Sequence, residues 1–97
     1  GGAKQIVNGE ITIGNSSSYS LTPESGNIGT LHTIHGGSFD GQLLTLRTTL
    51  VAYQILCEDN TGNLRLAGNT NLDNGQDRLI VQFDGQNWVE WISKNNT

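Results

Sequence analysis

The sequence has 97 residues, of which 34% are hydrophobic and 14% are charged, and its formal net charge is −4. A chain of this length has room for one hydrophobic core and therefore for one domain. Its five basic residues form no cluster that could neutralise a run of phosphates, which argues against a nucleic-acid partner. The longest apolar stretch, residues 50–57, is far shorter than the roughly 20 residues that cross a bilayer, so we expect no membrane insertion.

Turn-forming residues divide the chain into short segments, and Gly stands beside Asn or Asp at many of the divisions, among them Asn8-Gly9, Gly62-Asn63 and Asn74-Gly75. Several segments alternate apolar and polar residues, which is typical of strands. We predict strands at residues 10–14, 18–22, 31–35, 42–48, 52–58, 63–67, 78–83 and 87–92. Many short strands between frequent turns predict an all-β fold, specifically a small antiparallel β-sandwich of the jelly-roll kind. Cys57 has no second cysteine to pair with, and we expect it to be a buried apolar residue.

Two reversals of the chain are predicted from local sequence. Asp84-Gly85 lies between two apolar strands and supplies the positive φ angles of a hairpin turn, which Gln86 and Asn87 lengthen. A second reversal is predicted at residues 60–63, between the strands at 52–58 and 63–67.

Apolar residues occur on both faces of the last two predicted strands. In residues 78–83, Ile80 faces away from its apolar neighbours, and in residues 87–92, Trp88 and Ile92 oppose Val89 and Trp91. Because each sheet of a small monomer has one wet face, this pattern predicts a second burial surface supplied by another copy of the chain. Coverage by the chain's own loops is the alternative. We expect one tryptophan to be buried and the other to be partly exposed.

Three phrases together carry a family resemblance: "GGSFDGQLLTLRT" at 36–48, "EDNTGNLRLAGNTNL" at 58–72 and "DRLIVQFDGQNWVEW" at 77–91. In this order they resemble the small C-terminal β-domain at the distal end of bacteriophage tailspikes and tail fibres, over about residues 28–92. The resemblance implies a C-terminal domain, and we expect residues 1–97 to form a single one. The stretch before Ile28 lies outside the resemblance, and within it we expect residues 1–9 to be a linker or tag remnant. The resemblance also implies a homotrimer that follows an upstream β-helical shaft, in a virion outside the cell.

The function implied by the resemblance is non-enzymatic: the domain trimerises, caps the shaft and takes part in host attachment, with host-surface polysaccharide as a further ligand. A monomeric carbohydrate-binding module and a polysaccharide lyase or hydrolase fragment remain as alternatives. The candidate carbohydrate contacts are Trp88, Trp91, Tyr53 and Arg65. The residues expected in the core or the trimer interface are Leu44, Leu46, Leu64, Leu66, Ile80 and Phe83.

Arg65 carries the one charge in residues 62–70, and its guanidinium is suited to carboxylates. We expect it to pair with Asp59, Asp77 or Glu90 of the same or a neighbouring subunit, or else with an anionic sugar.

Catalysis by polysaccharide hydrolysis would need two carboxylates about 5 to 10 Å apart. The acidic candidates are Asp40, Asp73, Asp77, Asp84 and Glu90, but most of them lie in turns, where Asp is favoured for local hydrogen bonding. His32 and His35 are three apart and would point to opposite faces of a strand, so they cannot chelate one ion within a chain. We therefore predict no catalytic residues, metal or cofactor.

Overall fold

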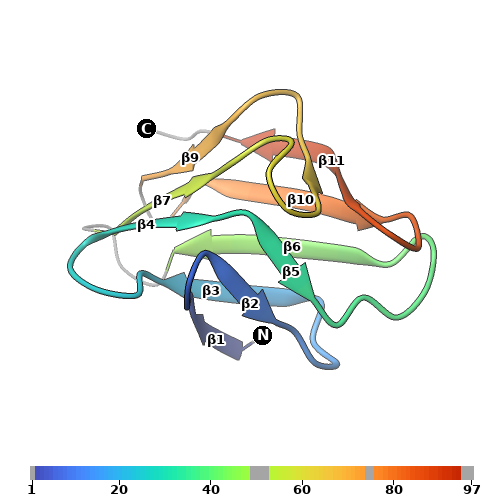
Figure 1. Ribbon diagram of the computed structural model, residues 1–97, viewed down its shortest axis with the longest axis horizontal. Coiled ribbons are helices and arrows are strands. Elements are labelled where there is room, and N and C mark those ends of the chain that lie inside the picture. Colours follow the sequence, from blue (N-terminus) through green and yellow to red (C-terminus); the bar gives the residue numbers. More distant parts are fainter. Residues whose placement is uncertain (1, 49–52, 74–75, 95–97) are drawn as a thin grey trace.

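The computed structural model describes residues 2–48, 53–73 and 76–94 (Figure 1). The fold is all-β, as predicted, and no helix occurs in these three segments. The strands are β1 (Gly2–Gln5), β2 (Glu10–Thr12), β3 (Ser18–Thr22), β4 (Ile28–Leu31), β5 (Thr33–His35), β6 (Leu43–Thr48), β7 (Gln54–Cys57), β8 (Leu64–Arg65), β9 (Thr70–Leu72), β10 (Arg78–Phe83) and β11 (Trp88–Lys94). Within the described part of the chain there is accordingly no helix that is long and apolar enough to cross a membrane.

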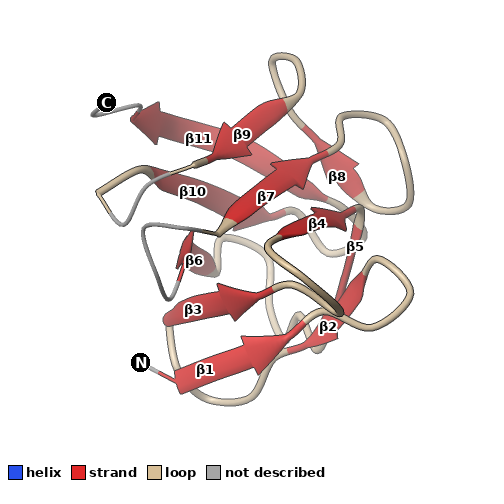
Figure 2. Cartoon of the chain, turned by 90° about the vertical axis from the view of Figure 1, so that its left-hand side faces the viewer, coloured by secondary structure: helices blue, strands red, loops and turns tan. Residues whose placement is uncertain are grey.

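The strands form two walls around one core. One wall is a six-stranded sheet in the order β1-β3-β6-β10-β11-β8, and the facing strands form a three-stranded sheet, β4-β7-β9, and a two-stranded sheet, β2-β5 (Figures 1 and 2). Alternate residues point inward because side chains of a strand alternate between its faces. Leu44 and Leu46 of β6 and Leu79 and Val81 of β10 are fully buried in this way.

The N-terminal two thirds of the chain runs in stacked coils. Strand β1 pairs in parallel with β3, and β3 with β6, while β5 lies parallel to β2 and β7 lies parallel to β4. Each pass of the chain therefore lies on the previous one, as in a solenoid (Figure 2). The predicted antiparallel sandwich is wrong in this respect. Parallel partners need long connections between them, and here those connections contain the strands of the opposite wall.

Main-chain hydrogen bonds join the coils at one corner of the stack. His32 donates its main-chain N–H to the Gly9 carbonyl, at 2.8 Å, and Asn63 donates to the His32 carbonyl, at 3.2 Å. The Asn63 side chain continues this ladder, because its Oδ1 accepts from the Ile34 N–H and its Nδ2 donates to the Ile34 carbonyl, each at 2.8 Å. Gly62 has φ +61°, and a Cβ there would collide with the Thr33 side chain and the His32 carbonyl. The Gly62-Asn63 pair is thus required by the stacking.

Strands β6, β10 and β11 pair antiparallel, whereas β11 pairs in parallel with the short strand β8. Strand β10 pairs with β6 and with β11, and the predicted hairpin at Asp84-Gly85 is confirmed. Asp84 Oδ1 accepts the N–H groups of Gln86 and Asn87 at 2.9 and 2.7 Å, which explains the lengthened loop. The chain also turns at residues 60–63, with Asn60 donating to the Leu64 carbonyl at 3.0 Å. That turn makes no hairpin, because β7 and β8 belong to different sheets.

Three strands were not predicted: β1, β4 and β9. Strand β1 lies in the segment expected to be a linker or tag remnant. That expectation is wrong for residues 2–6, because β1 pairs with β3 and Ile6 is buried in the core. The predicted turn at Asn74-Gly75 and the first residue of the predicted 52–58 strand lie outside the described residues.

The core is apolar and contains most of the residues predicted for it. Leu44, Leu46, Leu64 and Leu66 are buried, together with Ile6, Ile11, Ile13, Tyr19, Leu21, Leu31, Ile34, Ile55, Cys57, Leu72, Leu79, Val81 and Trp88. Burial raises the pKa of the Cys57 thiol to about 12, which agrees with the prediction that this residue acts as a small apolar side chain.

Candidate functional site

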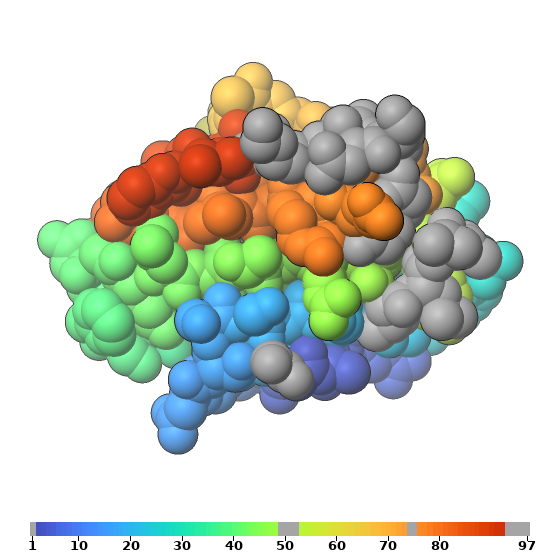
Figure 3. Space-filling view, turned by 180° about the vertical axis from the view of Figure 1, so that it is seen from behind, coloured from blue at the N-terminus to red at the C-terminus, as the bar shows by residue number. Residues whose placement is uncertain are grey.

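The outward side of the six-stranded sheet carries an apolar surface, which we call the outer face and define as Leu43, Ile80, Val89, Trp91 and Ile92. Figure 3 views the molecule from this side, with β3, β6, β10 and β11 next to one another. Four of the five residues are between 40% and 54% exposed, and Ile80 is half-buried between Thr45 of β6 and Ile92 of β11. This arrangement agrees with the sequence prediction that both faces of the last two strands are apolar.

A β-bulge shapes the outer face. Ile80 lies opposite Ile92, but the next residue, Val81, lies opposite Glu90, so Trp91 is the extra residue in β11. Bulges re-aim side chains by breaking the alternation of a strand. Here the bulge allows both Trp91 and Ile92 to be exposed, so the prediction that Ile92 lies on the same face as Trp88 is wrong.

Most of the aromatic residues predicted to contact carbohydrate are buried or half-buried, which limits the access of a sugar ring to them. Trp88 is fully buried and packs against Phe83, with ring centroids 4.9 Å apart. Tyr19, which was not among the candidate contacts, is also buried, and its hydroxyl accepts the Gly14 N–H at 2.7 Å. Tyr53 is half-buried, and Trp91 is 54% exposed. The expectation of one buried and one exposed tryptophan is confirmed, and Trp91 is the tryptophan that a ligand can reach.

Arg65 binds main chain. Its Nη1 donates to the carbonyls of Gly62 and Leu64, at 3.1 and 2.9 Å, and so braces the turn before β8. Two of its predicted partners also bind main chain: Asp59 accepts from the Leu66 N–H at 2.7 Å, and Glu90 accepts from the Ala67 N–H at 3.2 Å. Arg65 therefore has a structural role within its own turn.

Among the acidic candidates, the structure brings Asp73 and Asp77 together. Asp77 is 1% exposed and accepts the Asp73 N–H at 3.1 Å. The hydrogen bond from the Asp77 side chain raises the pKa of Asp73, and burial and the Asp77 charge raise it further. A carboxyl group as buried as that of Asp77 does not reach a polysaccharide. Asp84 differs, because the N–H groups of Asn87 and Gln86 lower its pKa.

The two histidines have separate partners. His35 Nε2 lies 2.7 Å from Glu10 Oε1 on the exposed side of the β2-β5 pair, and His32 Nδ1 lies 2.7 Å from Thr33 Oγ1. Over residues 2–48, 53–73 and 76–94, no group of three or more His, Cys, Asp or Glu side chains is placed to hold a metal ion.

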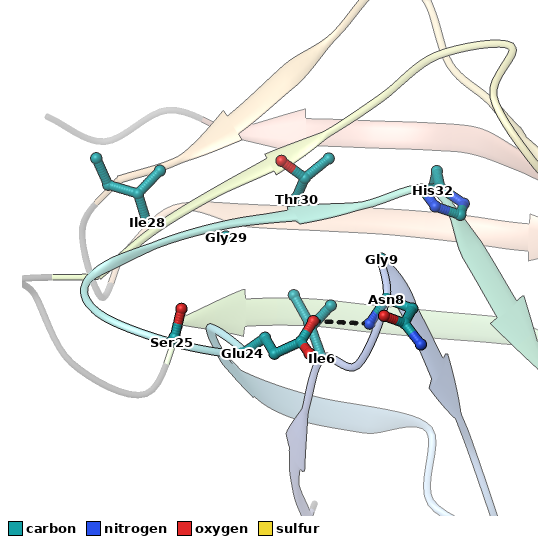
Figure 4. A pocket seen from close by; sticks show the side chains of 9 residues that line it. All are labelled: Ile6, Asn8, Gly9, Glu24, Ser25, Ile28, Gly29, Thr30 and His32. Carbon is teal, nitrogen blue, oxygen red and sulfur yellow. Dashed lines mark hydrogen bonds between the residues drawn. The ribbon is translucent and has the colours of Figure 1, made fainter.

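A groove of about 580 Å³ lies between β4 and the first coil (Figure 4). We call it the β4 groove; it is lined by Ile6, Asn8, Gly9, Glu24, Ser25, Ile28, Gly29, Thr30 and His32. Glu24 Oε1 accepts the Asn8 N–H at 2.8 Å, and the Glu24 carbonyl accepts from Gln5 Nε2 at 3.2 Å. Sequence reasoning missed this groove, because its residues come from two segments, 6–9 and 24–32, that meet only through the stacking of the coils.

Comparison with known proteins adds no assignment to these surfaces. No protein-family model and no curated protein matches the chain.

Proposed function

We propose that this chain is a non-enzymatic trimerisation and capping domain, of the kind found at the distal end of phage tailspikes and tail fibres. The proposal joins the three sequence phrases to one structural observation. Parallel coils run through most of the chain and then end against an antiparallel hairpin, β10–β11. A capping domain needs one end that continues a shaft and another end that closes it.

The two ends of the stack differ in the way that capping requires. Strand β1 stands at one end of the six-stranded sheet, and its outer edge is open to a further parallel strand. Near the other end, β11 pairs antiparallel with β10 on one side and parallel with β8 on the other (Figure 2). It therefore joins the hairpin to the last coil of the stack. The open end of a solenoid exposes unpaired main-chain groups that can pair with other chains, and many proteins prevent this by covering that end with a further structure. In this proposal an upstream β-helical shaft pairs with the β1 end.

The outer face supports the trimerisation part of the proposal. Leu43, Val89, Trp91 and Ile92 expose apolar area on one side of one sheet, in a chain with few charges. Contiguous exposed apolar surface marks interaction sites in soluble proteins. Three copies related by a threefold axis would bury this face against one another. In this proposal the trimeric domain is part of a phage tail outside the cell.

Multi-angle light scattering on the domain tests the oligomeric state directly. The expected mass is three times the 10.4 kDa of one chain. A mass of one chain at micromolar concentration would contradict the proposal. It would leave Trp91 free on the surface and favour the alternative of a monomeric carbohydrate-binding module.

The non-enzymatic part has its own test. Incubation with host-envelope polysaccharide should release no new reducing ends. Turnover that is lost in Asp73→Asn or Asp40→Asn would contradict this part of the proposal while leaving the trimer unaffected.

A further inference from the structure

The β4 groove lies where the stack lacks a strand. The second and third coils each carry a strand on this wall, β4 and β7, between their other strands. The first coil has no such strand, because residues 6–9 lead directly from β1 to β2. Figure 4 shows the result: β4 has β7 on one side and, on the other, the groove above Asn8 and Glu24.

The edge of β4 directs main-chain groups into this groove. Asn27 and Leu31 present their carbonyls to β7, since these accept from Gln54 and Glu58 at 2.8 and 2.9 Å. In a strand of a parallel ladder, the N–H and C=O groups of one residue point to the same side, and those of the next residue point to the other side. Ile28 and Thr30 therefore direct their N–H and C=O groups toward the groove. The next residue in this alternation, His32, does pair on that side, with the Gly9 carbonyl.

The side chains of the groove suit a peptide better than a sugar. Ile28 is 71% exposed beside the β4 edge, and Ile6 forms an apolar floor. Glu24 uses Oε1 to bind Asn8 and has a second carboxylate oxygen for a cation. The lining contains no Trp, Tyr or Phe on which a pyranose ring could stack.

We propose that the β4 groove binds an extended peptide segment of a partner protein, which adds a strand to the free edge of β4. The segment places an aliphatic side chain against Ile28 and a Lys or Arg side chain near Glu24. Main-chain hydrogen bonds to Ile28 and Thr30 hold it, as in other cases of strand addition. The groove lies on the wall opposite the outer face, so this inference does not depend on trimerisation through that face.

Amide hydrogen exchange provides the first test. In the free protein the Ile28 and Thr30 amides should exchange much faster than those of Gly29 and Leu31, which pair with β7. Equal protection of all four amides would overturn the proposal, because the edge would then be occupied already.

The second test tethers a probe strand in the groove. Ser25 is exposed at one end of the groove and is changed to cysteine, while the buried Cys57 does not compete for the label. A peptide of sequence Cys-Gly-Thr-Val-Lys-Val-Thr is attached by a disulfide, which holds it near the edge at an effective concentration on the order of millimolar. Exchange at Ile28 and Thr30 should slow by about tenfold relative to the same variant capped with cysteine alone.

Two controls separate strand addition from other contacts. The peptide with N-methylated main-chain amides should give no protection. Thr30→Pro should remove the protection at Ile28 while leaving the β4–β7 ladder in place, because proline is tolerated where an edge N–H faces outward, and Thr30→Val should keep it. The proposal is overturned if the tethered peptide gives no protection or if the N-methylated peptide protects equally. It is also overturned if glucose oligosaccharides protect these amides and the peptide does not.

Discussion

Asn63 joins two coils through its side chain, and removing that side chain should destabilise the whole domain. Asn63→Ala deletes two hydrogen bonds of 2.8 Å to Ile34 and leaves the main-chain N–H and carbonyl of a buried residue without a partner. Each lost bond costs about 1 kcal/mol, and a stranded buried group adds a similar amount, so the free energy of unfolding should fall by about 2 to 4 kcal/mol. This is a large part of the stability of a small domain.

Urea unfolding followed by tryptophan fluorescence measures this change. The matched control is Asn71→Ala on β9, where the side chain is exposed, and it should change the free energy of unfolding by no more than about 0.5 kcal/mol. A loss below about 0.5 kcal/mol in Asn63→Ala would refute the argument that the side chain continues the β5 ladder.

The pH dependence of Asn63→Asp gives an independent check. The new carboxylate would face the Ile34 carbonyl where an amide N–H now donates, so its pKa in the folded state should be raised. A raised pKa makes its contribution to stability largest below the unfolded value and lost as the pH rises through the folded value. The variant should therefore be as unstable as Asn63→Ala at pH 7 and should recover part of its stability near pH 4.

Three further changes test other parts of the structure. If the proposed trimer forms through the outer face, Trp91→Ser combined with Ile92→Thr should give the mass of one chain in light scattering, whereas Ile28→Thr, an exposed isoleucine on the other wall, should leave the mass unchanged. Asp84→Asn should lower the urea midpoint at pH 7, and this loss should shrink as the pH falls, because the pKa of Asp84 is lowered in the folded state and its contribution disappears as the pH falls through that folded value. A loss that stays the same from pH 7 into acid would contradict the assignment. The Cys57 thiol should resist a thiol reagent at pH 8 until the protein unfolds, since burial raises its pKa to about 12, and rapid labelling of the native protein would show that the core opens easily.

The sequence contained enough information for most of the described strands and their inward faces, because alternation reports which side of a strand is apolar. It also predicted the Asp84-Gly85 hairpin, whose two strands are neighbours in the chain. Alternation does not report which strand lies beside which. Tyr19 is opposite Leu46 in the sheet, and nothing in either local pattern indicates this pairing.

The missed strands were short or lacked a clear alternation. Strand β1 has the sequence "GAKQ", with no β-branched or aromatic residue, and it forms because β3 offers it a parallel partner. The two candidate surfaces, the outer face and the β4 groove, also differ in how far the sequence could predict them. Apolar residues on both faces of β10 and β11 were predicted, although alternation alone placed Ile92 on the face of Trp88. The β4 groove was not predicted, because it depends on the absence of a strand from the first coil.

Stacked coils also limit how the chain can change in length. A single residue inserted in the middle of β3 would shift every side chain after it in that strand to the opposite face. A complete extra coil inserted at the turn between β2 and β3 would instead leave the neighbours of β6 and of the β10–β11 hairpin unchanged. Such a coil would bring its own inward apolar residues and would need its own small residue at the corner, as Gly62 is needed at the present one. Proteins built in this way can therefore lengthen or shorten by whole coils while their C-terminal closure stays the same.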